Sequence, residues 1–282
     1  MTNSKGNFEA KKSLGQHFLR SEKALQQMKD SVVNFSKQIK ESEVVIFEIG
    51  PGEGVLTSKL LEYGGKVVVI EIDKRAIEFL KERFAEQIKN KKLLILEKDC
   101  LEVDYQKEIS LTLFAQQGTV QYVLVGNIPY YITGAIFRHT FEQKVLPLTA
   151  TFLVQKEVAD RVVARDKKES ILSISVKIFG DAKVVDIVKA GSFVPPPKVD
   201  SAILQISEIE NPFKSKEEYA IFFEIMKSAF KQKRKYALSN IKNNLQEKLL
   251  DKYFDKLKTF IEEKQRAEDI SLSTWKKIIS EI

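Results

Sequence analysis

Short apolar runs alternate with amphipathic helical patterns along most of the chain. The runs are dominated by aliphatic residues and cover residues 44–50, 66–73, 93–99, 122–127 and 150–155. Strands that are apolar throughout are buried on both faces of a sheet, and helices between them favour parallel pairing. The pattern therefore predicts an α/β fold in which helices cover both sides of an open sheet.

The C-terminal part of the chain has a different pattern. Two more segments, 170–180 and 199–207, are predicted to be strands, and no helical pattern separates them. We therefore expect an antiparallel strand at one edge of the sheet. Beyond residue 210 only helical periods remain. The sequence thus predicts an α/β domain of residues 1–210 and a small helical domain of residues 211–282.

The net charge of +7 is carried by the two ends of the chain. Residues 1–40 have a net charge of +5 and residues 211–282 also have +5, whereas residues 41–210 have −3. Basic flanks around a site suit a polyanion such as nucleic acid. Solubilising lysines on exposed helices would give the same totals, so charge alone leaves both interpretations open.

Several classes of protein are disfavoured by composition. Cys100 is the only cysteine, so an intramolecular disulfide is excluded and a reducing compartment is natural. No apolar run approaches the ~20 residues of a membrane span, and the first residues lack the apolar core of a signal peptide. His17 and His139 have no partners at metal-ligand spacing, so no metal is expected. We expect a cytoplasmic monomer.

A glycine loop follows the first predicted strand, in the sequence FEIGPGEG. It contains Gly50, Gly52 and Gly54, and in open α/β sheets ligands bind at the carboxyl ends of the strands. The second strand ends near Glu71 and the third at Asp99. A carboxylate at the second position can accept the hydroxyl hydrogens of a ribose, and one at the third can reach an adenine amino group. This arrangement predicts a nucleoside cofactor.

The acidic surroundings of the loop narrow the choice of cofactor. Val55 stands where a dinucleotide fingerprint requires its third glycine. Glu48 and Glu53 lie beside the loop, and negative charge there disfavours a pyrophosphate. S-adenosylmethionine, with its sulfonium and amino groups, fits better. A simple tight turn after a strand would explain the glycines alone.

The sequence Asn-Ile-Pro-Tyr, residues 127–130, follows the fourth predicted strand. Methylating an exocyclic adenine amine requires acceptors that bind its hydrogens and free the nitrogen lone pair. The Asn127 side-chain oxygen is one acceptor, and the Ile128 carbonyl, held outward because Pro129 disfavours a helical conformation there, is the other. Tyr130 offers a flat face for the base. Taken alone, the four residues could also be a turn before a helix.

Five segments together resemble a known family. They are KKSLGQHFL (11–19), EIGPGEG, IEID, NIPY and FVPPPKVDSAIL (193–204). Over nearly its whole length the chain resembles the ribosomal RNA adenine N6,N6-dimethyltransferases, and more closely their small-subunit branch. The resemblance implies a Rossmann-like methyltransferase domain and a C-terminal all-helical domain. It also implies methyl transfer from S-adenosylmethionine to two adjacent adenines near the 3′ end of 16S RNA, during small-subunit biogenesis.

The resemblance also implies roles for individual residues. Residues 1–40 would close over cofactor and RNA, and Phe193 would stack on the target adenine opposite Tyr130. The implied catalytic residues are Asn127, Ile128, Pro129, Tyr130 and Phe193. The implied cofactor-binding residues are His17, Leu19, Gly50, Gly52, Glu71, Ile72, Asp99, Cys100 and Asn127. The expected RNA-binding residues are Lys11, Lys12, Lys198, Lys231, Lys233, Arg234 and Lys235.

The chain departs from the family at two positions. Ile128 stands where leucine is more common, and Tyr131 begins a Tyr-Ile-Thr-Gly sequence where the family more often has Asn-Ile-Ser-Thr. Three other functions remain open. They are a large-subunit adenine methylase that confers macrolide resistance, a mainly non-catalytic ribosome-assembly factor, and an NAD-dependent oxidoreductase. The missing third glycine counts against the oxidoreductase.

Overall fold

The structure is a computed structural model that describes residues 15–36, 44–111 and 121–282. The chain forms two compact units. The first contains residues 1–159 and 183–209, and the second contains residues 160–182 and 210–282. Residues 160–182 thus join the helices beyond residue 210, although they precede the boundary that the sequence predicts.

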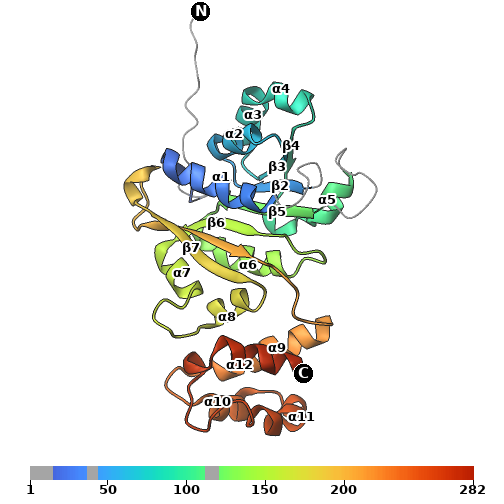
Figure 1. The fold of residues 1–282 in the computed structure, drawn as a ribbon, viewed down its shortest axis with the longest axis vertical. Coiled ribbons are helices and arrows are strands. Elements are labelled where there is room, and N and C mark those ends of the chain that lie inside the picture. Colours follow the sequence, from blue (N-terminus) through green and yellow to red (C-terminus); the bar gives the residue numbers. More distant parts are fainter. Residues whose placement is uncertain (1–14, 37–43, 112–120) are drawn as a thin grey trace, which may run out of the picture. The chain divides into compact units, whose positions relative to one another are not determined.

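A seven-stranded sheet forms the centre of the first unit (Figure 1). Five strands are parallel, and β9 pairs with β6 in the antiparallel direction. Across the sheet the order is β4 (Leu93–Glu97), β3 (Lys66–Glu71), β2 (Val44–Ile49), β5 (Gln121–Asn127), β6 (Ala150–Gln155), β9 (Ser201–Ser207) and β7 (Asp181–Val188). The predicted α/β class and the five parallel strands are confirmed. An antiparallel strand is also present, but β9 lies between β6 and β7 and not at the predicted edge of the sheet.

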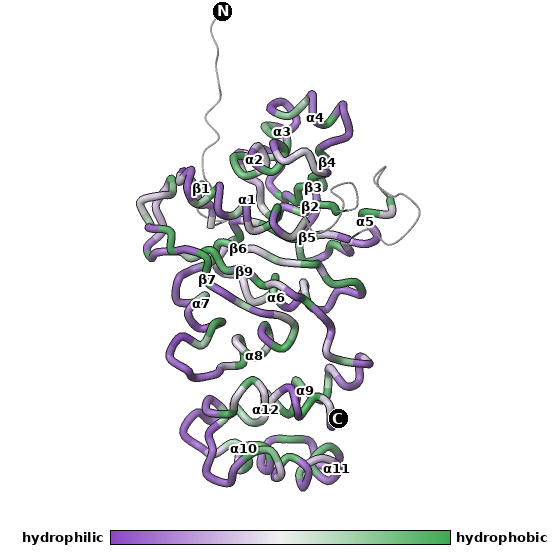
Figure 2. Tube along the Cα trace, viewed as in Figure 1, coloured by the Kyte–Doolittle hydropathy of each residue, from purple (hydrophilic) through white to green (hydrophobic). Residues whose placement is uncertain are grey.

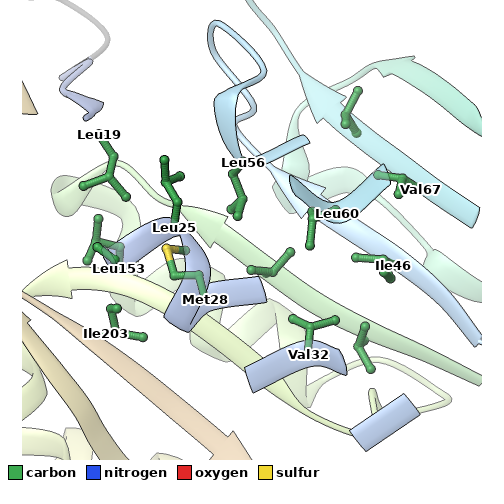
Figure 3. Close-up of a cluster of buried hydrophobic side chains, with 14 of the residues drawn as sticks. Leu19, Leu25, Met28, Val32, Ile46, Leu56, Leu60, Val67, Leu153 and Ile203 are labelled. Carbon is green, nitrogen blue, oxygen red and sulfur yellow. The ribbon is translucent and has the colours of Figure 1, made fainter. Parts of the chain in front are cut away.

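Both faces of the sheet are buried, as the continuous apolar runs predict. Ile46 belongs to a cluster that also holds Met28 of α1 and Leu60 of α2 (Figure 3). The next residue, Phe47, packs edge-on against Tyr105 of α5. Adjacent residues of a strand point to opposite faces, so both faces carry helices. The helices of this part of the chain are α1 (Glu22–Ser36), α2 (Val55–Glu62), α3 (Lys74–Arg83), α4 (Ala85–Lys89), α5 (Tyr105–Leu111), α6 (Thr133–Phe141) and α7 (Lys156–Val162).

The N-terminal segment pairs with a distant part of the chain. Strand β1 (Phe18–Leu19) forms a short antiparallel ladder with β8 (Phe193–Val194). Short 3-10 turns follow three strands of the sheet: η3 (Cys100–Glu102), η4 (Tyr130–Ile132) and η5 (Ala190–Ser192). A further turn, η6 (Ala267–Asp269), lies between helices of the second unit.

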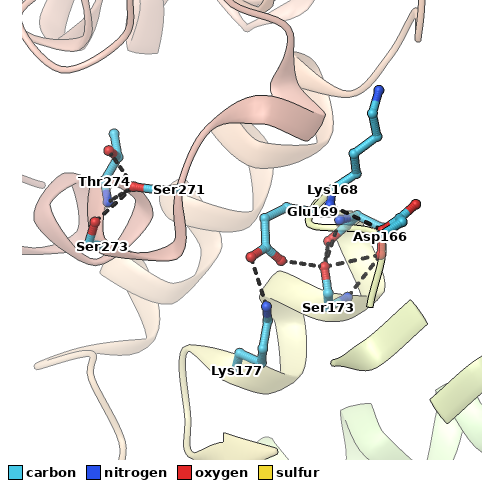
Figure 4. A network of polar contacts seen from close by, with 9 residues as sticks. Asp166, Lys168, Glu169, Ser173, Lys177, Ser271, Ser273 and Thr274 are labelled. Atoms are coloured by element: carbon cyan, nitrogen blue, oxygen red, sulfur yellow. Dashed lines mark hydrogen bonds and ion pairs between the residues drawn. The ribbon is translucent and has the colours of Figure 1, made fainter. Parts of the chain in front are cut away.

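The predicted strand at 170–180 is wrong, because residues 171–177 form helix α8 (Ile171–Lys177). Ser170 and Ser173 form a reciprocal capping box that satisfies two amide groups at the helix start. Lys177 pairs with Glu169 at 2.7 Å across the same helix (Figure 4). The alternating Ser and Ile residues imitate a strand, but these local polar contacts favour the helix. The strand that was not predicted, β7, begins just after it.

The second unit is helical, as predicted for the C-terminal part of the chain. Its core contains Trp275, which is buried and packs edge-on against Phe222 with ring centroids 5.9 Å apart. Helices α10 and α11 alternate hydrophobic and hydrophilic segments, which is typical of amphipathic helices (Figure 2). The long helices beyond residue 210 are α9 (Lys216–Ala229), α10 (Ala237–Asn244), α11 (Glu247–Leu257) and α12 (Leu272–Ser280).

Neither a membrane-spanning helix nor a cluster of metal-binding side chains occurs in the part of the chain that the structure describes. In residues 15–36, 44–111 and 121–282, no helix combines the length and apolar character needed to cross a bilayer. The same residues contain no group of three or more His, Cys, Asp and Glu side chains placed to hold a metal ion.

Candidate active site

A cavity of about 320 Å³ lies at the carboxyl ends of β2, β3, β4 and β5. Its walls come from the glycine loop, from the segments after the neighbouring strands, and from the N-terminal segment. Every residue predicted to bind the cofactor lines it, namely His17, Leu19, Gly50, Gly52, Glu71, Ile72, Asp99, Cys100 and Asn127. Parallel strands bring these distant segments to one edge of the sheet, where ligands of such sheets bind.

The glycine loop requires glycine for both conformation and space. Gly50, Gly52 and Gly54 have φ angles of 67°, 54° and 73°, in the left-handed region. A Cβ atom at Gly52 would lie 2.8 Å from the ring of Phe18, which belongs to the N-terminal segment. The bare backbone of the loop therefore lets the N-terminal segment pack directly on it.

Glu53 is neutralised within the protein. Its carboxylate pairs with Arg20 at 2.5 Å, and its backbone carbonyl accepts a hydrogen bond from Arg83 at 2.6 Å. The sequence argument for a cationic ligand counted Glu53 as a free acid beside the loop. In the structure that argument depends on Glu71 instead, which also lines the cavity.

Glu71 is fixed at the end of β3 by backbone amides. Its carboxylate accepts hydrogen bonds from the amides of Ile72 and Asp73 at 2.9 Å and of Gly52 at 3.4 Å. Burial raises its pKa, and the three backbone donors oppose that effect. A carboxylate has about four acceptor positions, so Glu71 ties the loop to β3 and keeps acceptor capacity for a ligand.

Asp99 and Cys100 lie after β4. Asp99 caps the following 3-10 turn by accepting a hydrogen bond from the amide of Leu101 at 2.9 Å. Burial, reinforced by the charge of Asp99, raises the pKa of the Cys100 thiol to about 12. The thiol is therefore protonated at neutral pH and lines the cavity as a small apolar group, not as a nucleophile.

Glu48 lies in the cavity wall with its carboxyl group buried. Burial raises its pKa from 4.5 to about 8, although Thr57 donates a hydrogen bond to it at 2.6 Å, and the nearby charge of Glu71 raises the pKa further. The folded protein therefore holds a proton on Glu48 over a pH range in which the unfolded chain has released it. Consequently, the free energy of unfolding falls as the pH rises from 4.5 to 8.

We expect the Glu48→Gln variant to lose this pH dependence. The amide keeps the shape and the acceptor for Thr57, but it carries no ionisable proton. Relative to the wild type, the variant should gain stability on the order of a few kcal/mol between pH 5 and pH 8. Urea unfolding of both proteins at these two pH values measures the gain. A difference that stays constant with pH would contradict the protonated state of Glu48.

Asn127 occupies the end of β5 with its amide group held in one orientation. Its Nδ2 donates a hydrogen bond of 2.7 Å to the backbone carbonyl of His17. With the nitrogen committed there, Oδ1 is the atom available to accept from a ligand. The Ile128 side chain is buried, and the ring of Pro129 restricts the backbone to an extended conformation. Both features restrict the backbone directly after Asn127.

Tyr130 joins three distant segments at the cavity. Its hydroxyl group contacts Oγ of Ser201 at 2.6 Å, and its ring lies nearly parallel to that of His17, with centroids 6.0 Å apart. Nδ1 of His17 is 2.8 Å from the carbonyl of Pro195. Burial raises the pKa of Tyr130, so its phenol stays neutral and serves as an aromatic face. Ser201 was not predicted as a site residue, although it belongs to the family segment 193–204.

The structure corrects the predicted position of Phe193. The side chain is only 2% exposed, packs in the same hydrophobic cluster as Leu25 and Met28, and is absent from the cavity wall. Its pairing with Leu19 in the β1–β8 ladder directs it inward, whereas the next residue, Val194, is exposed. Phe193 therefore supports the N-terminal segment from the core and does not face a base in this arrangement.

Five of the seven predicted RNA-binding residues belong to the described part of the chain, and all five are exposed. Lys198 is exposed in the segment between β8 and β9. Four more are exposed just after α9 and form what we call the basic cluster, which is Lys231, Lys233, Arg234 and Lys235. Lys11 and Lys12 lie outside the described residues.

Gly126 does not line the cavity but supports it from within the sheet, and the sequence reasoning missed this role. It directly precedes Asn127 in β5 and is paired in register with Ile49 of β2. A Cβ atom at this position would lie 2.4 Å from the backbone oxygen of Ile49. A glycine inside a strand often marks such a close backbone approach, and this was the signal available in the sequence.

Comparisons with known proteins identify the family of this chain. The family model for ribosomal RNA adenine dimethylase matches residues 7–282. The ribosomal RNA small subunit methyltransferase A of Fusobacterium nucleatum is 37% identical, over 96% of this chain and 97% of its own length. The protein of the same name from Dehalococcoides mccartyi is 33% identical, over 97% of this chain and 88% of its own length.

Solved structures show the same fold. A dimethyladenosine transferase from Plasmodium falciparum has a TM-score of 0.70 and 26% identity, over 94% of this chain and 97% of its own. The 23S rRNA methyltransferase ErmE has a TM-score of 0.68 and 21% identity, over 93% and 98% of the two chains, and shows the fold alone. From the family match and the relatives, this chain belongs to the ribosomal RNA adenine dimethylase family of methyltransferases.

Proposed function

We propose that this protein transfers methyl groups from S-adenosylmethionine to N6 of two adjacent adenines near the 3′ end of small-subunit ribosomal RNA. The observation that carries the proposal is the Asn127 amide, which the backbone carbonyl of His17 holds in one orientation in a cavity that Tyr130 also lines. It lies in the same cavity as Glu71 and Asp99. The cavity thus holds a hydrogen-bond acceptor for the amine of a target adenine together with hydrogen-bond acceptors for a nucleoside cofactor. Relatives named for the small subunit support the choice of RNA.

The cavity residues fit the proposed cofactor. Glu71 keeps acceptor capacity for ribose hydroxyl groups, Asp99 offers a carboxylate for an adenine amino group, and the bare backbone at Gly50 admits the methionine part. Among the acids of the cavity wall, Glu71 is the one that faces a positively charged ligand, because Glu48 is held protonated and Glu53 is paired with Arg20. When bound, S-adenosylmethionine supplies a methyl group on a sulfonium, which is an electrophile that needs no metal. The protein's own part is to place the acceptor amine.

The protein activates the amine by positioning and electrostatics. Oδ1 of Asn127 and the carbonyl of Ile128 would accept the two amine hydrogens, which frees the nitrogen lone pair. The ring of Tyr130 would stack on the base and offset part of the cost of unstacking it from the RNA. In each transfer the bond from the methyl group to the sulfonium would break as the bond to N6 forms, which would leave a neutral thioether, and N6 would lose one hydrogen as a proton to solvent.

The direct test is transfer of labelled methyl from S-adenosylmethionine to unmethylated small subunits. Fully methylated small subunits and unmethylated large-subunit RNA are the controls. We expect label only on the unmethylated small subunit, as N6,N6-dimethyladenosine. Label on large-subunit RNA would favour the resistance methylase instead. No label, combined with tight binding of the subunit, would favour a mainly non-catalytic assembly factor.

We also propose that the basic cluster contacts RNA phosphates. Each phosphate contact contributes roughly 0.7–0.9 to the slope of log affinity against log salt. Alanine at all four positions should therefore weaken binding to the small subunit and lower that slope by about 3, with cofactor affinity unchanged. A matched control removes four exposed lysines of the same unit that lie outside the cluster, Lys242, Lys248, Lys276 and Lys277. Equal slopes for the two variants would mean that total charge matters and the cluster does not.

A further inference from the structure

Tyr131 is exposed at the cavity wall, directly beside the face proposed for the target base. Its side chain is 70% exposed. Among the described residues, the exposed large hydrophobic side chains that also line the cavity are Ile72 and Tyr131. Single exposed hydrophobic residues are common on protein surfaces, but an aromatic ring at the wall of a proposed nucleotide site has a chemical use.

The local backbone separates the directions of the two adjacent tyrosine rings. Tyr130 and Tyr131 begin the 3-10 turn η4, in which successive side chains diverge by about 120°. The Tyr130 ring turns inward toward His17 and Ser201, as its contacts show. The Tyr131 ring instead lies against the backbone of Gly15, where a Cβ atom would be 3.5 Å from its Cε1 atom. It is therefore supported by the N-terminal segment and still largely uncovered.

We propose that Tyr131 is a stacking site for the nucleotide next to the adenine being methylated, an inference that rests on the proposed function. When one of two adjacent adenines leaves the stack to enter the cavity, its neighbour loses a stacking partner. A supported aromatic ring at the adjacent position of the chain replaces that partner. Such stacking is tolerant of sequence, so either adenine could occupy the Tyr131 site while the other reacts.

The test uses small subunits reconstituted with RNA in which one of the two target adenines is replaced by an abasic site. The remaining adenine is then the only methyl acceptor, and its neighbour has no base. Natural subunits serve as the second substrate. The proteins are the wild type, Tyr131→Ala, and Tyr131→Phe, which keeps the ring. KM and kcat are measured for each protein with each substrate, together with cofactor affinity as a control for folding.

With natural subunits we expect Tyr131→Ala to raise KM for RNA roughly tenfold, because one base-stacking contact is lost. Tyr131→Phe should remain within about twofold of the wild type, since the ring does the stacking. With abasic subunits, the KM of the wild type should also be about tenfold higher than with natural subunits. The KM of Tyr131→Ala should be the same for the two substrates. Cofactor affinity should be unchanged throughout.

Two results would overturn the proposal in different ways. If Tyr131→Ala raises KM over that of the wild type by the same factor with natural and with abasic subunits, the ring does not act through the neighbouring base. If the variant equals the wild type on natural subunits, the ring has no role in RNA binding. Failure of the proposed function would instead show as a wild-type protein that transfers no methyl group to either small subunit.

Discussion

Replacing Asn127 with alanine is expected to lower the rate of methyl transfer by roughly a hundredfold to a thousandfold, the usual effect of removing one preorganised group that stabilises a transition state. The side chain contributes the Oδ1 acceptor for the adenine amine, and its orientation is set by the 2.7 Å bond from Nδ2 to His17. Cofactor affinity should change by no more than a few-fold, because Glu71 and Asp99 remain. Single-turnover transfer to unmethylated small subunits and cofactor titration measure the two effects.

The Asn127 variant also releases the His17 carbonyl, so a control must separate anchoring from chemistry. Gln16 provides it, because its Nε2 donates a hydrogen bond to Asp73 at 3.3 Å and ties the same N-terminal segment to the end of β3. We expect Gln16→Ala to have a much smaller effect on transfer than Asn127→Ala. Similar losses in both variants would show that anchoring of the segment, and not the Asn127 oxygen, limits the reaction.

Replacing Gly126 with alanine is expected to lower the free energy of unfolding by about 3 kcal/mol, the upper end of the cost of overpacking. The added Cβ would lie 2.4 Å from the backbone oxygen of Ile49, and backbone atoms of a central strand cannot rotate away. Relief requires β2 and β5 to separate. Because these strands carry Gly50 and Asn127, methyl transfer should fall as well. The urea midpoint of unfolding measures the effect on stability.

Gly134 is the matched control for this substitution. It lies in the first turn of helix α6, and a Cβ atom there would have no heavy atom within 4 Å. Alanine should therefore stabilise the protein by about 0.5–1 kcal/mol, because glycine is unfavourable within a helix. A Gly126→Ala variant as stable as Gly134→Ala would show that β2 and β5 are not held as closely as the structure has them.

The parallel sheet was predictable because its signal is local. The apolar runs at β2, β3 and β5 are continuous, and a strand buried on both faces requires that pattern wherever the chain goes. Residues 171–177 were mistaken for a strand because Ile and Ser alternate there. The helix depends on the capping box of Ser170 and Ser173 and on the ion pair between Glu169 and Lys177. Such polar contacts do not produce a periodic hydrophobic pattern, so the pattern of the sequence does not predict this helix.

By itself the sequence determined the α/β class, the glycine loop and the carboxylates at the ends of β3 and β4, since strand ends and turns are encoded by neighbouring residues. Only the tertiary structure decided what the site residues face. Asn127 is oriented by a carbonyl 110 residues away, and Phe193 is drawn into the core by its pairing with Leu19. Tyr131 is left exposed against Gly15. Side-chain direction at these positions depends on contacts between distant segments, which form only when the chain folds.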